Sequence, residues 1–117
     1  MTGKIVVHIL TPPMRTQNVR GFLTPIILNS NLFKEIGIHF RYFTKNSARI
    51  SECDFLFINA KFYGKIWNSN PGIILEALSN YRQGGPVIFY CDNYDSTALI
   101  RTEVLPLIDV YFKNMVL

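Results

Sequence analysis

The run IVVHIL at residues 5–10 is an almost unbroken series of aliphatic and β-branched side chains, and TPP at residues 11–13 ends it. A strand with this composition is typical of a parallel sheet in which helices cover both faces. Other runs of the same character predict four further strands along the chain. These runs are Ile38–Thr44, Cys53–Asn59, Pro86–Cys91 and Asp109–Lys113.

Helical patterns lie between most of these strands. Apolar residues recur near helical spacing from Phe22 to Ile36, and Gly37 is placed to end that helix. Asn70-Pro71 predicts the start of a second helix over 71–83, whose apolar face is spaced at i, i+3, i+4 and i+7. Ser96 caps a third predicted helix over 96–107. The segment 45–52 is too short for a long crossover helix, and we expect a turn or two there.

Strands and helices therefore alternate, which predicts an α/β domain. We expect a Rossmann-like three-layer α/β/α sandwich with a parallel five-stranded sheet. Numbered along the chain, its strands should have the order 3-2-1-4-5. The length of 117 residues suits one domain over 1–117. Because an apolar segment ends the chain directly after the last strand, we expect it to be a piece of a longer two-domain protein.

Composition narrows the classes of partner. The chain has 12 Lys and Arg against 8 Asp and Glu. These basic residues are scattered singly rather than gathered in a stripe, so we predict no nucleic-acid partner. No apolar run approaches the roughly 20 residues of a membrane span. The first apolar run lacks the length and cleavage site of a signal peptide, which predicts a cytoplasmic location. Cys53 and Cys91 are expected to be buried, reduced thiols.

The common catalytic and cofactor-binding motifs are not found in the sequence. The loop after residues 5–10 contains neither GxGxxG nor a P-loop, and no GxSxG elbow occurs. A response-regulator receiver would need acidic residues ending the first strand and Asp ending the third, where this chain has Leu10-Thr11 and Asn59. Of the two histidines, His8 is expected in the core and His39 on the surface of the sheet. We therefore predict no metal site and no cofactor.

Polar side chains do follow three of the predicted strands. Because ligands of α/β sheets bind at the carboxyl ends of the strands, these residues are the candidate site, and we expect Thr11, Arg15, Asn59 and Asp92 to line one cleft. Asp92, Asn93 and Asp95 have two interpretations, functional carboxylates or a turn with a helix cap. The candidates are Thr11, Arg15, Asn18 and Arg20 after the first strand, Asn59 and Lys61 after the third, and Asp92 and Asp95 after the fourth.

Three segments also resemble a known family. CDFLFINAKFYG at 53–64, PVIFYCDNYDS at 86–96 and LPLIDVYFK at 105–113 are similar to the N-terminal half of GT-B glycosyltransferases, in particular divergent bacterial and phage members. The resemblance covers most of the chain. It departs from the family at residues 11–13, where TPP replaces the glycine-rich loop of many members, and in lacking the C-terminal nucleotide-sugar domain.

The resemblance implies the acceptor-binding half of a transferase, inactive alone, that moves a sugar from a nucleotide-sugar donor to an acceptor. A C-terminal domain that this chain lacks would hold most of the donor. If the transfer inverts the configuration of the sugar, Asp92 would be the catalytic base, with Asp95 as the second choice. Arg15, Arg20 and Lys61 would bind an anionic acceptor or the leaving diphosphate, and Thr11, Asn18 and Asn59 would complete the substrate site. The alternative is a non-catalytic flavodoxin-like regulatory or interaction module, because a fold alone does not establish function.

Overall fold

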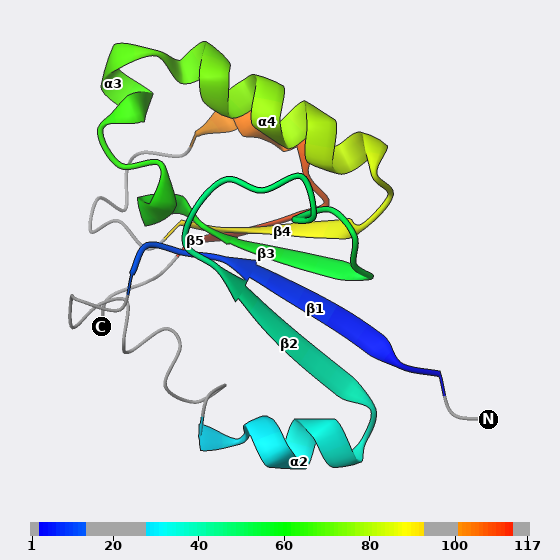
Figure 1. Cartoon of the computed structure of the whole chain (residues 1–117). Coiled ribbons are helices and arrows are strands. Elements are labelled where there is room, and N and C mark those ends of the chain that lie inside the picture. The colour runs from blue at the N-terminus through cyan, green and yellow to red at the C-terminus, as the bar shows by residue number, and fades with distance from the viewer. Residues whose placement is uncertain (1–2, 14–27, 93–100, 114–117) are drawn as a thin grey trace.

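The computed structural model describes residues 3–13, 28–92 and 101–113. Its five strands form one sheet in which every neighbouring pair is parallel, so the predicted α/β class is confirmed (Figure 1). Each strand overlaps the run that predicted it. The strands are β1 (Ile5–Leu10), β2 (Ile38–Phe43), β3 (Phe55–Asn59), β4 (Val87–Asp92) and β5 (Val110–Lys113).

The strand order is β2-β1-β3-β4-β5, and the predicted order 3-2-1-4-5 is wrong. β3 pairs with β1 from Val7↔Phe55 to Leu10↔Ile58, instead of lying outside β2. The polarity of the strands explains the difference. The first four residues of β3 are all apolar and suit a position between two strands, whereas β2 carries an exposed Arg41 and suits an edge.

The crossover from β2 to β3 is an irregular segment, residues 44–54, that passes across the sheet on the side of α4 (Pro71–Gln83) (Figure 1). Ile50 anchors it, because this side chain is fully buried in the main core. At Gly84, which follows α4, an added Cβ would lie 2.7 Å from the Cβ of Ser51. The crossover is thus packed closely against the sheet and the end of α4.

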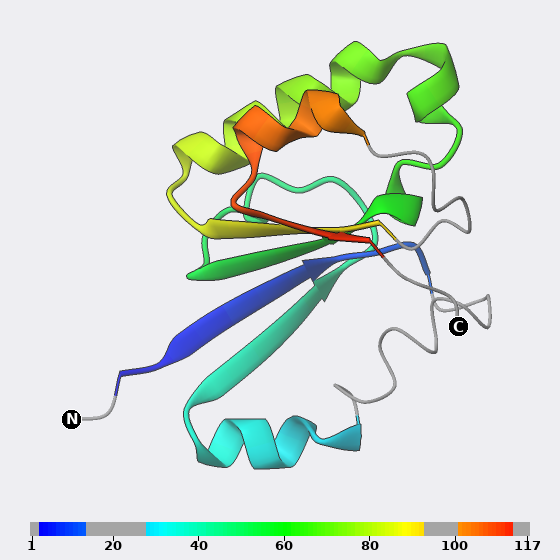
Figure 2. The ribbon, with the colours of Figure 1, turned by 180° about the vertical axis from the view of Figure 1, so that it is seen from behind.

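Helices lie on both faces of the sheet, giving the three predicted layers (Figures 1 and 2). α4 confirms the helix predicted over 71–83. On the opposite face, α2 (Ser30–Glu35) lies against β2 and ends before Gly37, which has a φ of 88°. The other helices on the α4 face are η1 (Ala60–Phe62), α3 (Ile66–Ser69) and η2 (Thr102–Leu107).

Two helix predictions need correction or fall partly outside the structure. Of the helix predicted over 96–107, the described part is the 3₁₀-helix η2 rather than an α-helix, and it contains Pro106, which cannot donate a helical hydrogen bond. Ser96 lies outside the described residues, as does the first part of the helix predicted to end at Gly37. Within the described ranges, no helix is long and apolar enough to cross a membrane.

The main core lies between the sheet and α4. Leu56, Ile58, Ile88 and Tyr90 point into it from the two central strands β3 and β4. Because side chains alternate along a strand, the residues between them face the other way. There, Val7 and Ile9 of β1 form a smaller core with partly buried phenylalanines of β2 and β3.

Candidate functional site

The described helices that follow β1 and β3 in the sequence lie on opposite faces of the sheet. The next described helix after β1 is α2 on one face, while η1, α3 and α4 follow β3 on the other face (Figure 2). In a sheet of order 2-1-3-4-5, this point between neighbouring strands is where ligands bind. Thr11 and Asn59 lie there, one residue beyond β1 and at the end of β3.

Thr11 and Asn59 are hydrogen-bonded to each other and to the backbone around them. Asn59 Nδ2 donates to Thr11 Oγ1 at 3.4 Å, and Asn59 Oδ1 accepts from the Lys61 amide at 3.0 Å, which caps η1. Thr11 Oγ1 also donates to the Pro12 carbonyl at 3.2 Å. Thr11 is 1% exposed and Asn59 is 0% exposed. The two side chains therefore join the ends of β1 and β3 inside the protein.

Asp92 is the last residue of β4 and is only 3% exposed. Its Oδ2 accepts a hydrogen bond from the Tyr111 hydroxyl at 2.5 Å and lies 3.2 Å from Lys113 Nζ. The Tyr111 hydroxyl in turn accepts from the Arg101 amide at 3.1 Å. Burial and the bond to Asp92 raise the pKa of Tyr111 to about 12, so the phenol stays protonated and donates to the carboxylate. Asp92 is thus the acceptor of a buried network that joins β4 to β5.

The sheet separates these two groups of polar residues. Asp92 follows Tyr90 by two positions and so shares the α4 face with it. Asn59 alternates with Ile58, which faces α4, and therefore belongs to the opposite face with Thr11. The structure brings Thr11 and Asn59 together, and places Asp92 at the same end of the sheet but on its other face. Lys61 is half-buried in η1, directly after the end of β3. The other candidates, Arg15, Asn18, Arg20 and Asp95, lie outside the described residues.

Tyr111 and Lys113 were not among the predicted site residues. They are two positions apart on β5, and the register pairs Tyr111 with Tyr90 and Lys113 with Asp92. A tyrosine and a lysine two positions apart on the strand next to Asp92 are the sequence pattern that could have indicated partners for this carboxylate. The sequence predicted both strands, but not which residues of them lie opposite each other.

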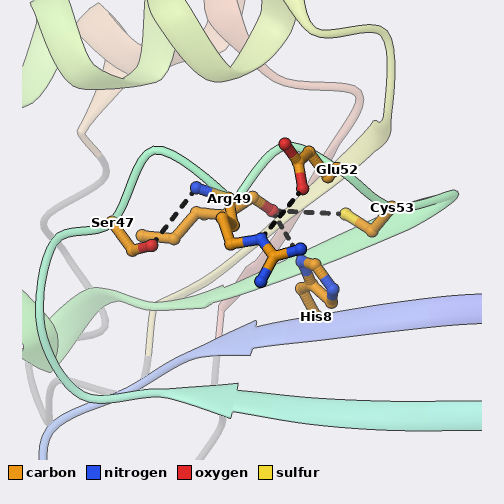
Figure 3. A network of polar contacts seen from close by, with 6 residues as sticks. His8, Ser47, Arg49, Glu52 and Cys53 are labelled. Carbon is orange, nitrogen blue, oxygen red and sulfur yellow. Dashed lines mark hydrogen bonds and ion pairs between the residues drawn. The ribbon is translucent and has the colours of Figure 1, made fainter.

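A second group of polar contacts holds the crossover segment onto β1 (Figure 3). The His8 imidazole, 2% exposed, donates through Nδ1 to the Ile50 carbonyl at 2.9 Å. The Cys53 thiol donates to the same carbonyl at 3.4 Å. Burial raises the pKa of Cys53 to about 11 and that of Cys91 to about 12, so both thiols are protonated and unreactive near neutral pH.

The prediction that His8 belongs to the core is confirmed by its burial. Farther along the crossover, Arg49 Nε and Glu52 Oε2 form a solvent-exposed ion pair at 3.3 Å (Figure 3). In the described residues, no group of three His, Cys, Asp or Glu side chains is placed to hold a metal ion. Comparison with protein families, with curated proteins and with solved structures gives no match for this chain.

Proposed function

We propose that this chain is a non-catalytic flavodoxin-like α/β module with a regulatory or interaction role. The observation that carries the proposal is the environment of Asp92. A general base must offer a lone pair to a substrate hydroxyl within hydrogen-bond reach. Asp92 is almost fully buried, and its Oδ2 already accepts from Tyr111 and Lys113. Its contacts explain the residue as a structural link between β4 and β5.

The strand order is a second support. The order 2-1-3-4-5 is that of flavodoxin-like domains, whereas 3-2-1-4-5 begins the dinucleotide-binding order. The support is by analogy, since one fold serves many functions. Thr11 and Asn59 point the same way, because their polar groups join β1 to β3 instead of facing solvent.

The proposal is tested by measuring transfer and hydrolysis with the complete gene product. The substrates are a panel of uridine, guanosine and thymidine diphosphate sugars, and binding is followed by thermal shift. We expect neither turnover nor a shift in melting temperature with any member. Turnover that Asp92→Asn abolishes, and that the surface control Glu52→Gln retains, would overturn the non-catalytic proposal.

The second candidate is the acceptor-binding half of a glycosyltransferase. It is supported by the resemblance of three segments and by the position of Thr11, Asn59 and Asp92 at the carboxyl end of one sheet, where α/β enzymes bind ligands. In that case, Asp92→Asn in the complete enzyme should lower turnover by a factor of about 10²–10⁴. The 117 residues alone should show no transfer. A normal turnover per folded molecule in Asp92→Asn would remove Asp92 from the mechanism.

A further inference from the structure

The sheet face opposite α4 is apolar across three neighbouring strands. Phe57, Phe89 and Phe112 form a row, with ring centroids 4.5 Å and 6.0 Å apart and interplanar angles of 5° and 14°. Phe112 is 51% exposed and Val87 is 38% exposed. We call this surface the aromatic face. Alternation along β3, β4 and β5 assigns to it Phe55, Phe57, Val87, Phe89, Val110 and Phe112.

α2 lies on the same side of the sheet, against β2 (Figure 1). Its inner contact is Phe33, whose ring packs edge-on against Phe40 at 5.0 Å. Three large apolar residues at four-residue intervals are exposed on and beside it: Leu28 before the helix, Leu32 within it and Ile36 at its C-cap, at 77%, 57% and 65%. We call these three residues the α2 ridge. A surface helix normally has a polar outer side, so the ridge is suited to a second packing partner.

We propose that a second copy of this chain packs face to face with the first, so that the α2 ridge of each copy covers the aromatic face of the other. The dimensions match, because three strands at about 4.8 Å spacing make a surface roughly 10 Å wide. A helix with its side chains is about 10 Å across. On this face α2 covers β2 of its own copy, and in the proposed arrangement the α2 ridge of the partner would cover β3, β4 and β5.

The area available fits a dimer better than an isolated surface patch. Ile5 and Tyr42, 38% and 37% exposed, extend the apolar surface along β1 and β2 on the same side. If each large apolar residue has roughly 150–200 Å² of accessible area, these two residues, the ridge, Val87 and Phe112 expose roughly 550–700 Å² per copy. A standard interface buries about 800 Å² per partner. One two-fold axis would cover the ridge and the aromatic face of both copies.

The test is the molar mass of the intact chain in solution, by light scattering and sedimentation velocity. The dimer should have a mass of 27 kDa, twice the 13.5 kDa of one chain. Leu32→Lys and Phe112→Glu should each give a folded monomer, because both side chains are more than half exposed and contribute little to the core. The matched control is Ile73→Lys, which places the same charge at a 53% exposed position on α4 and should leave the dimer intact.

Mixing the two monomeric variants distinguishes this arrangement from other dimers. In the mixed pair, Lys at position 32 of one copy meets Glu at position 112 of the other, and the second ridge and second aromatic face are unchanged. We therefore expect equimolar Leu32→Lys and Phe112→Glu to restore the 27 kDa species. A wild-type chain that is monomeric at all concentrations tested would overturn the proposal. So would a dimer that either variant leaves intact, or a mixture that stays monomeric.

Discussion

Replacing Asp92 by Asn is the most direct test of its structural role. The change removes the negative charge that faces Lys113 Nζ at 3.2 Å, where the two side chains are only 4% and 16% exposed. Removing one partner of a buried ion pair costs about 3–5 kcal/mol, because the other buried charge loses its close counter-charge. The amide oxygen of Asn can still accept from Tyr111, so we expect the low end, about 3 kcal/mol. For a chain of this size, that corresponds to a fall in melting temperature of about 12 °C.

Trp67 provides the signal for this experiment, because it is the single tryptophan and is 5% exposed. Its fluorescence in a urea titration gives the free energy of unfolding of each variant. The matched control is Glu52→Gln, which removes a carboxylate from an exposed pair with Arg49. Exposed pairs contribute about 0–1 kcal/mol, so this variant should unfold close to wild type.

A double-mutant cycle with Lys113→Met assigns the loss to the pair itself. We expect Asp92→Asn and Lys113→Met to be coupled by about 1–3 kcal/mol, as for contacting buried residues. A loss below about 0.5 kcal/mol in Asp92→Asn, or a coupling near zero, would refute the reasoning. Asp92 would then not be the link between β4 and β5 that its contacts indicate.

Three further predictions concern the crossover segment and the thiols. Gly84→Ala should lower the free energy of unfolding, measured by urea titration, by about 1–3 kcal/mol, because the added Cβ would lie 2.7 Å from Ser51. Adding Ser51→Gly to the same chain should recover most of the loss, and no recovery would contradict the close packing. His8→Leu should cost about 1–3 kcal/mol by removing a buried donor to Ile50, whereas a neutral result would show that the crossover does not need this bond. Burial raises the pKa of the Cys91 thiol from 9.0 to about 12. The stability that this thiol contributes is therefore complete below pH 9 and is lost between pH 9 and 12, where the thiol of the unfolded chain ionises first. The free energy of unfolding of Cys91→Val should fall less steeply than that of wild type over this range, and equal slopes would contradict the prediction.

The strands and α4 were predictable because local composition determines them. The run at 5–10 is apolar at every position but His8, and Asn70-Pro71 marks the helix start whatever the surroundings are. Strand order is a different kind of property, because it depends on which strands gain most from burial on both sides. The exposed Arg41 in β2 and the apolar composition of β3 do indicate which strand lies at the edge. That indication is found only when the two strands are compared with each other as candidates for the edge position.

The candidate site was predictable in position but not in role. Thr11, Asn59 and Asp92 do lie at the carboxyl end of the sheet, as their places after apolar runs indicate. Their roles depend on neighbours across the sheet, since Asp92 acquires Tyr111 and Lys113 only through the register of β4 with β5. The predicted single cleft assumed that residues at one end of a sheet also share one face, which the alternation of side chains does not require.

The distribution of reactive and apolar groups favours a binding surface over a reaction centre. In an active site, perturbed ionisable groups line a cleft that substrate can enter. Here His8, Cys91 and Asp92 are each less than a tenth exposed, and His8 and Asp92 donate to or accept from internal partners. Leu32 and Phe112, by contrast, are more than half exposed on the other side of the sheet. We infer that the exposed apolar residues, rather than these three buried groups, are the part of the described chain suited to contact another folded surface, and the mass measurements with Leu32→Lys and Phe112→Glu test that inference directly.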